Sequence, residues 1–107
     1  MGESDELTPR LSHTVVRPGD GSVVVALDGE LDIATSDELD AAVSDAITGE
    51  ITRLVVDAAR LRFADSSAIA LWVSWSRRVP RLEIRNPSPM VRRVIETMGL
   101  TKVLNPS

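Results

Sequence analysis

A continuous apolar run is the feature of this sequence that most restricts how the chain can fold. Five apolar residues follow one another over 23–27, and a shorter run covers 54–56. Runs of this length, rich in Val and Leu, are typical of strands covered on both faces in a largely parallel sheet. The chain has 107 residues, a size at which one domain with one core is expected. The sequence therefore predicts a single domain built around a sheet.

Three helices are expected, at 35–47, 66–79 and 88–98. In the first, apolar residues recur three and four positions apart, and Thr35 and Glu38 have the spacing of a capping box. The third begins with a Ser-Pro pair, and Ser is a common cap ahead of a Pro at the first helical position. Its apolar stripe, like that of the first helix, is expected to face the core.

Two more strands complete the expected order. Residues 11–18 precede a Pro-Gly-Asp-Gly turn, so this strand and the run at 23–27 should form a hairpin. Residues 81–85 alternate charged and apolar side chains, the pattern of a strand with one wet face. The predicted order is β-β-α-β-α-β-α, an α/β fold with a mixed, mostly parallel sheet.

Composition indicates the limits of the domain and its compartment. Residues 1–10 are mostly polar and acidic and are expected to form a flexible N-terminal tail, which leaves 11–107 as the domain. This start does not have the pattern of a signal peptide. The longest uncharged run, 66–76, is far shorter than the ~20 residues that cross a bilayer. We therefore expect a cytoplasmic protein with no membrane segment, and a monomer at this size.

Composition also argues against several kinds of function. The net charge is −4, whereas nucleic acids are held by clustered Lys and Arg, so no nucleic-acid partner is expected. With no Cys, the chain has neither a thiolate for zinc nor a Cys nucleophile. His13 is the single histidine, which leaves no His pair for a metal or a proton relay. Neither a metal nor a cofactor is expected.

The segment ahead of the second helix carries the candidate chemistry. It contains Asp65, Ser66 and Ser67, and Asp32 follows the earlier strand. In parallel sheets, functional groups gather at the carboxyl ends of the strands. We therefore expect Ser66 at a helix N-terminus, reached from the strand at 54–56 through a short loop, with both carboxylates nearby.

Other interpretations of these residues are open at this point. Asp and Ser ahead of an apolar helix are commonly caps with no further role. A Ser-His-Asp hydrolase would need His13 as its base, and the Gly-x-Ser-x-Gly elbow is absent. The carboxylates of Asp32 and Asp65 would suit acid–base chemistry or a cation, but nothing else in the chain supplies further ligands. An enzyme is therefore the least favoured interpretation.

Four short motifs follow one another over about 11–104. They are Gly29-Glu30-Leu31-Asp32, Leu54-Val55-Val56-Asp57, Phe63-Ala64-Asp65-Ser66-Ser67, and Arg85-Asn86-Pro87-Ser88-Pro89 with Val91-Arg92-Arg93-Val94 and Gly99-Leu100. Together they resemble the STAS domain and, more narrowly, the anti-sigma factor antagonists of bacteria. Each motif alone is weak, but four in this order and spacing are fairly specific.

The resemblance implies a small βα sandwich with helices on one side of its sheet, and a role in partner switching. Members of the family bind an anti-sigma factor that is also a serine kinase, and so release its sigma factor; Mg-ATP would belong to that kinase. The kinase modifies the first Ser of Asp-Ser-Ser, here Ser66, and a serine phosphatase reverses the modification. The partner-facing surface implied by the motifs comprises Asp32, Asp65, Ser66, Ser67 and Ala68.

Alternatives stay open within this resemblance. Ser67 is the competing phosphorylation site. Ala68 replaces a Gly that is usual after the two serines, which allows a member that binds its partner without being phosphorylated. A different role would be that of a STAS subunit in a membrane lipid or anion transport system, where the domain stabilises a partner ATPase.

The expected helix at 66–79 is apolar around most of its circumference. Such a helix is either widely buried or covered by a partner. Its two tryptophans, Trp72 and Trp75, are expected to pack in the core. The alternative places one of them at a partner interface, where Trp is enriched.

Overall fold

The computed structural model describes residues 10–107, and within this range the chain forms one four-stranded sheet. Its strands are β1 (Leu11–Val16), β2 (Ser22–Leu31), β3 (Arg53–Ala64) and β4 (Leu82–Arg85), in the spatial order β1-β2-β3-β4. β1 and β2 are antiparallel, and the other neighbouring pairs are parallel. The predicted mixed, mostly parallel sheet is confirmed. The tail predicted for 1–10 lies outside the described residues except for Arg10.

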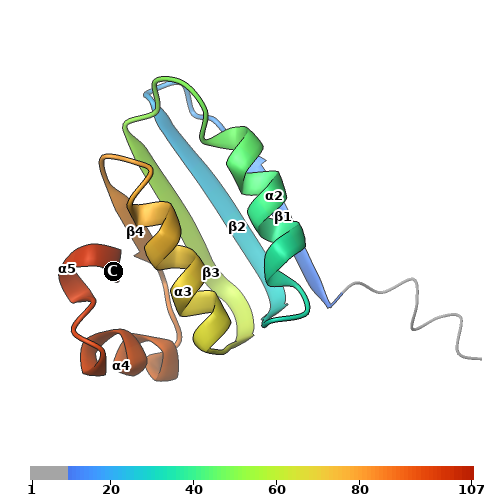
Figure 1. Cartoon of the computed structure of the whole chain (residues 1–107), viewed down its shortest axis with the longest axis vertical. Helices are drawn as coiled ribbons and strands as arrows, with labels where there is room; N and C mark the ends of the chain where they lie inside the picture. The colour runs from blue at the N-terminus through green and yellow to red at the C-terminus, as the bar shows by residue number, and fades with distance from the viewer. Residues whose placement is uncertain (1–9) are drawn as a thin grey trace, which may run out of the picture.

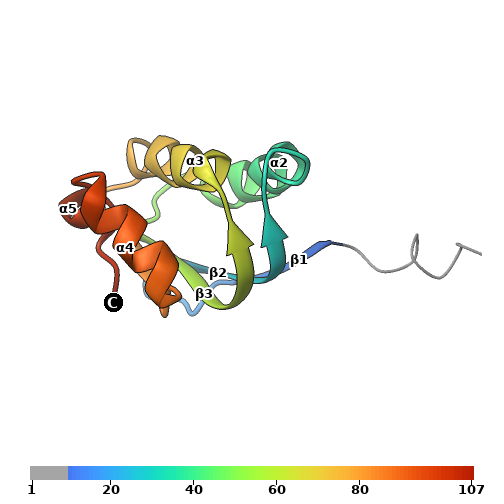
Figure 2. The ribbon, with the colours of Figure 1, turned by 90° about the horizontal axis from the view of Figure 1, so that it is seen from below.

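The helices are α2 (Ser36–Ala46), α3 (Ser66–Ser76), α4 (Pro89–Thr97) and α5 (Thr101–Leu104). Figures 1 and 2 show α2 and α3 on the same face of the sheet, with α4 and α5 beside β4. This order and one-sided layering agree with the α/β fold expected from the sequence. Two details differ, since α3 ends before the predicted position 79, and the single turn of α5 was not expected.

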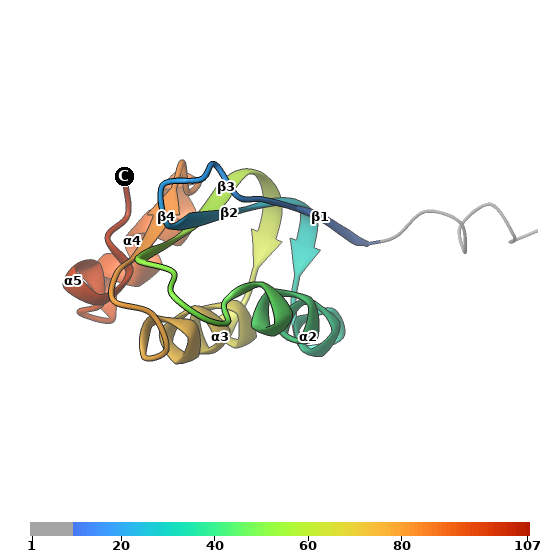
Figure 3. The same cartoon turned by 90° about the horizontal axis from the view of Figure 1, so that it is seen from above.

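The apolar run at 23–27 proves to be covered on one face only. Val23, Val25 and Leu27 are buried in the core, whereas Val24 and Ala26 between them are half-buried. Since α2 and α3 lie on one side of the sheet (Figure 3), the alternate residues of β2 face away from them. The expectation that this strand is covered on both faces is therefore wrong.

Two expectations about helix patterns are also wrong. The capping box at Thr35 does not form, because the Thr35 hydroxyl donates to the Glu30 carbonyl oxygen at 3.0 Å and makes no cap bond to α2. On α4, Val94 and Met98 are 38% and 55% exposed and therefore do not join the buried part of the stripe. The cap of α4 is confirmed, since the Ser88 hydroxyl accepts from a backbone amide within the first turn at 3.2 Å.

The core between the sheet and the helices contains both tryptophans. Trp72 and Trp75 are each 0% exposed, which confirms core packing and excludes the interface alternative. Their indole groups differ in one respect. Trp75 Nε1 donates to Asp40 Oδ1 at 2.8 Å, whereas Trp72 Nε1 has no hydrogen-bond partner among the described residues.

Replacing each tryptophan with Phe should separate the contribution of that hydrogen bond to the free energy of unfolding from the contribution of ring packing. Both variants lose a comparable part of a buried ring, but only Trp75→Phe breaks a hydrogen bond to a carboxylate, and Trp72→Phe removes an unpaired buried donor. We expect the free energy of unfolding of Trp75→Phe to fall by about 1–3 kcal/mol more than that of Trp72→Phe. Urea unfolding of the two proteins measures this difference, and equal losses would contradict it.

Candidate functional site

The carboxyl ends of β2 and β3 bring Asp32 and Asp65 together. Leu31 and Ala64 are paired at the ends of the two parallel strands, and each Asp is the next residue along the chain. The Asp65 amide donates to the Leu31 carbonyl oxygen at 3.3 Å. Figure 2 shows the two strands ending side by side below the first turns of α2 and α3. The short loop predicted before Asp65 is absent, because β3 continues to Ala64 through two register shifts.

Asp65 is the N-cap of α3. Its backbone is extended, and its Oδ1 accepts from the Ser67 amide at 2.8 Å, which satisfies one of the amides that a helix start leaves unpaired. The interpretation of Asp65 as a helix cap is therefore confirmed. The same contact fixes the carboxylate at the start of the helix, directly beside Ser66.

The residues that follow the cap differ sharply in accessibility. Ser66 is the first residue of α3 and is exposed, Ser67 is half-buried, and Ala68 is 0% exposed. Of the two candidate hydroxyl groups, that of Ser66 therefore belongs to the more accessible residue. The methyl group of Ala68 packs in the core, so a partner docked on this surface would not touch it.

Asp32 is held by contacts on both carboxylate oxygens. Its Oδ1 accepts from the amides of Ala34 and Thr35 at 2.9 and 3.2 Å, and its Oδ2 accepts a hydrogen bond from Arg10. The same Arg10 nitrogen also contacts Glu30 Oε1 at 3.1 Å. Only 12% of the Asp32 side chain is exposed. Asp32 therefore orders the turn between β2 and α2 and presents little of its carboxylate to solvent.

The surroundings of Asp32 lower the pKa of its carboxyl below the ordinary value. Burial raises the pKa, but the hydrogen bond from the Ala34 amide and the charge and hydrogen bond of Arg10 together outweigh it. A carboxyl whose pKa is lower in the folded state stabilises the fold above its unfolded pKa, and this contribution disappears as the pH falls through the folded pKa.

Asp32→Asn should therefore cost stability in a pH-dependent way. Asn keeps an oxygen acceptor for the two amides but loses the charge that pairs with Arg10. We expect the free energy of unfolding of the variant to lie below that of the wild type at pH 7, and the gap to shrink below about pH 4. Denaturant unfolding at four pH values between 3 and 7 measures the gap. A gap that does not change with pH would contradict the assigned ion pair.

A hollow of about 470 Å³ lies in front of these acids, and two apolar side chains border it. The lining residues are Arg10, Glu30, Asp32, Ile33, Phe63 and Asp65. Ile33 and Phe63 are 77% and 50% exposed. Exposed aromatic and aliphatic side chains beside a hollow are typical of binding surfaces. Neither residue is among the partner-facing residues expected from the sequence. The only signal for Phe63 was its place at the start of the Phe63-Ala64-Asp65-Ser66-Ser67 motif, two residues before Asp65.

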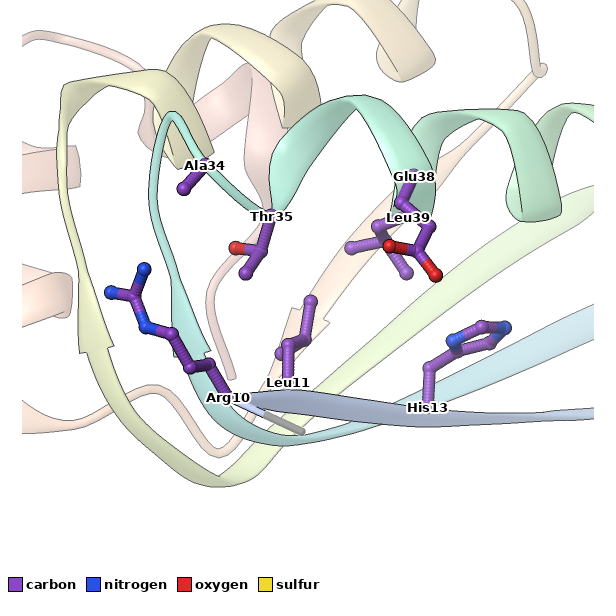
Figure 4. Close-up of a pocket in the computed structure, with 7 residues that line it drawn as sticks. All are labelled: Arg10, Leu11, His13, Ala34, Thr35, Glu38 and Leu39. Atoms are coloured by element: carbon purple, nitrogen blue, oxygen red, sulfur yellow. The ribbon is translucent and has the colours of Figure 1, made fainter. Parts of the chain in front are cut away.

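A second pocket, of about 270 Å³, lies between β1 and the start of α2. Figure 4 shows its lining residues, which are Arg10, Leu11, His13, Ala34, Thr35, Glu38 and Leu39. His13 projects from β1 into this pocket and does not line the hollow beside Asp65. The arrangement therefore gives no support to a Ser-His-Asp hydrolase built on Ser66.

The structure offers two further observations about chemistry. Among residues 10–107, no group of three or more His, Asp or Glu side chains is arranged to hold a metal ion. None of the helices in that range is long and apolar enough to cross a membrane. What the geometry does display is an exposed Ser66 next to Asp65, and a hollow lined by Asp65, Asp32 and two exposed apolar side chains, a surface suited to binding a protein.

The chain belongs to the STAS family. The family model described as Mlab, STAS domain, matches residues 14–105. This match covers nearly all of the region to which the four sequence motifs had pointed. Comparison with the curated proteins found no significant match.

Among solved structures, the chain is similar to anti-sigma factor antagonists. It is 31% identical to the anti-sigma factor antagonist SpoIIAA in its unphosphorylated form, with a TM-score of 0.77, covering 90% of this chain and 88% of that one. For the phosphorylated form of the Bacillus cell fate determinant SpoIIAA, the identity is 30%, the TM-score 0.72 and the coverage 90% and 91%. An antagonist from Mycobacterium paratuberculosis has the same fold, with a TM-score of 0.81, 23% identity and coverage of 92% and 87%.

Proposed function

We propose that this protein is an anti-sigma factor antagonist of the bacterial cytoplasm, switched off by phosphorylation of Ser66. In its unphosphorylated form it binds an anti-sigma factor that is also a serine kinase, which releases the sigma factor. A serine phosphatase restores the active form. The protein itself performs no chemistry, because Mg-ATP and the catalytic groups belong to the kinase.

The accessibility of Ser66 is the observation that carries this proposal. Its hydroxyl belongs to an exposed residue at the first position of α3, while Ser67 is half-buried and its amide is bonded to Asp65. Similarity to a protein known in both unphosphorylated and phosphorylated forms supports control of this protein by phosphorylation, and accessibility favours Ser66 as the site. We propose Asp32, Asp65, Ser66 and Ser67 as part of the partner-binding surface. We add Ile33 and Phe63 because they border the same hollow as Asp32 and Asp65.

A direct test mixes the purified protein with candidate anti-sigma factor kinases and Mg-ATP, and reads the intact mass. We expect a gain of one phosphate that is lost in Ser66→Ala and retained in Ser67→Ala. A phosphate that persists in Ser66→Ala but disappears in Ser67→Ala would move the site to Ser67. Tight binding with no phosphate would keep the antagonist role and remove the proposed switch.

Ala68 bears on the phosphorylation rate because it stands where Gly is usual in the family. Its methyl group is buried in the core rather than displayed to a kinase. We expect Ala68→Gly to lower the free energy of unfolding by about 1–2 kcal/mol, through lost helix propensity and a lost buried methyl. The rate of phosphate gain by the folded protein should stay within about twofold of the wild type. A large rise in that rate would show that the methyl group obstructs the kinase.

A role as a STAS subunit that stabilises a transport ATPase is the second candidate. The family model that matches the chain is described by the name Mlab rather than by antagonist function. Neither binding nor phosphate in the kinase experiment, together with a stable complex between this protein and an ATPase, would favour that role. Co-purification of a genome-encoded ATPase with the tagged protein provides the measurement.

A further inference from the structure

The outer edge of β4 is covered by residues 105–107, which we call the strap. β4 is the last strand of the sheet, and an edge strand normally leaves a row of backbone groups without a strand partner. Pro106 forms a parallel bridge with Ile84, and the Ser107 amide donates to the Ile84 carbonyl oxygen at 3.0 Å. In Figure 3 the end of the chain lies alongside β4.

The strap also forms hydrogen bonds with backbone groups at both ends of β4. At one end, the Asn105 side-chain amide donates to the Leu82 carbonyl oxygen at 2.7 Å. At the other end, the Asn86 amide donates to the Ser107 carbonyl oxygen at 3.1 Å. Together with the Ser107 amide bond to Ile84, these contacts reproduce with backbone and side-chain groups what a short added strand would supply.

Two further contacts hold the strap in place from outside the edge. Arg92, on α4, donates to the Ser107 carbonyl oxygen at 3.0 Å, and the Ser107 hydroxyl donates to Glu83 at 3.0 Å. Asn105, where the chain leaves α5, has a left-handed backbone with φ of 47°. Asn tolerates this conformation better than most residues, so the turn directs the strap back along β4.

We propose that the edge of β4 is a docking site for an extended segment, which the strap of the same chain occupies. When the strap is displaced, the edge accepts the same segment from a second copy. Addition of an extended segment to a sheet edge is a general mode of peptide recognition, in which backbone hydrogen bonds supply the affinity. The proposal concerns the sheet edge and is independent of the proposed phosphorylation of Ser66.

Ser107→Pro tests the proposal because it removes the amide that bonds to Ile84, while Ser107→Ala keeps that amide and loses only the hydroxyl. In Ser107→Pro we expect hydrogen exchange of the Asn86 amide to accelerate at least ~10-fold, with a change below about twofold in Ser107→Ala. A labelled peptide with the sequence of residues 101–107 should bind Ser107→Pro at least ~10-fold more tightly than the wild type.

A second pair of variants keeps the test valid if Ser107→Pro does not fold. Asn105→Val places a β-branched residue at a left-handed position, whereas Asn105→Gly keeps that backbone conformation and loses only the side-chain bond. We expect Asn105→Val to behave like Ser107→Pro. Unchanged exchange at Asn86, or faster exchange without binding of the peptide, would overturn the proposal. So would unfolding of both Ser107→Pro and Asn105→Val, because displacing the occupant of a docking site leaves the domain folded.

Discussion

Phosphorylation of Ser66 should weaken the affinity of this protein for its anti-sigma factor by at least ~100-fold, or about 2.7 kcal/mol. A phosphoserine adds a charge of about −1.5 to −2 at neutral pH. It would stand beside the Asp65 carboxylate, which already accepts from the Ser67 amide and so occupies part of the helix start. A partner surface fitted to a neutral hydroxyl would then meet excess negative charge, which costs several kcal/mol when like charges are brought together.

Isothermal titration with phosphorylated and unphosphorylated protein measures this loss. Ser66→Ala should bind within about threefold of the wild type, because the hydroxyl is small and exposed. Ser74→Asp is the matched control, since it adds a negative charge at another exposed position of α3, and it should leave the affinity unchanged. The melting temperature of the phosphorylated protein should change little, as a negative group at a helix N-terminus is tolerated. Full affinity of the phosphorylated form would refute the switch.

The parts of the fold that were predictable from sequence depend on short-range chemistry. The turn before β2, the Ser88 cap and the alternation in β4 each involve residues close together in the chain, and each is present in the structure. The position of Ser66 at a helix start was predictable for the same reason, since an Asp-Ser pair ahead of an apolar run is a local signal. Its exposure, and the partial burial of Ser67, follow from which side of α3 meets the sheet.

The length of β3 could not be predicted from the pattern of neighbouring residues in the sequence. Residues 57–64 carry two arginines and an aspartate, which end the apolar run of 54–56 and favour a loop ahead of Asp65. The strand forms because its backbone pairs with β2, and the two register shifts absorb the mismatch. Since strand pairing depends on a neighbour distant in sequence, composition alone did not reveal that Asp65 directly follows the sheet.

The environment of Asp32 was unpredictable for a related reason. Arg10 had been assigned to a tail, but the antiparallel register of β1 and β2 places its backbone beside Glu30, whose amide donates to the Arg10 carbonyl oxygen at 2.9 Å. The guanidinium then reaches both Glu30 and Asp32. A contact across about twenty residues leaves no periodic signal in sequence, whereas the carboxylates themselves were recognisable from their motifs.

Gly29→Ala should be among the most destabilising substitutions in the chain, with an expected loss of about 3–5 kcal/mol in the free energy of unfolding. Gly29 has a φ of +122°, a conformation essentially restricted to glycine. A Cβ at this position would overlap the Arg10 carbonyl oxygen and lie 3.0 Å from the carbonyl carbon. Both obstacles are backbone atoms, so no side-chain rotation relieves them. Either β2 would have to leave this conformation or the chain before β1 would have to move away.

Two controls separate these causes. Gly49→Ala also places a residue at positive φ, but its Cβ would have no neighbour within 4 Å, so we expect a loss of only about 1–2 kcal/mol. Arg10→Ala removes the exposed guanidinium while keeping the backbone, and should cost far less stability than Gly29→Ala, because exposed ion pairs contribute little. Urea unfolding of the three variants compares them directly. If Gly29→Ala proves no worse than Gly49→Ala, the close approach of residue 10 to β2 is not a constraint. If it is worse than both controls together, the glycine of the Gly-Glu-Leu-Asp motif is required so that the chain entering β1 can pass against β2 and bring Arg10 to Asp32.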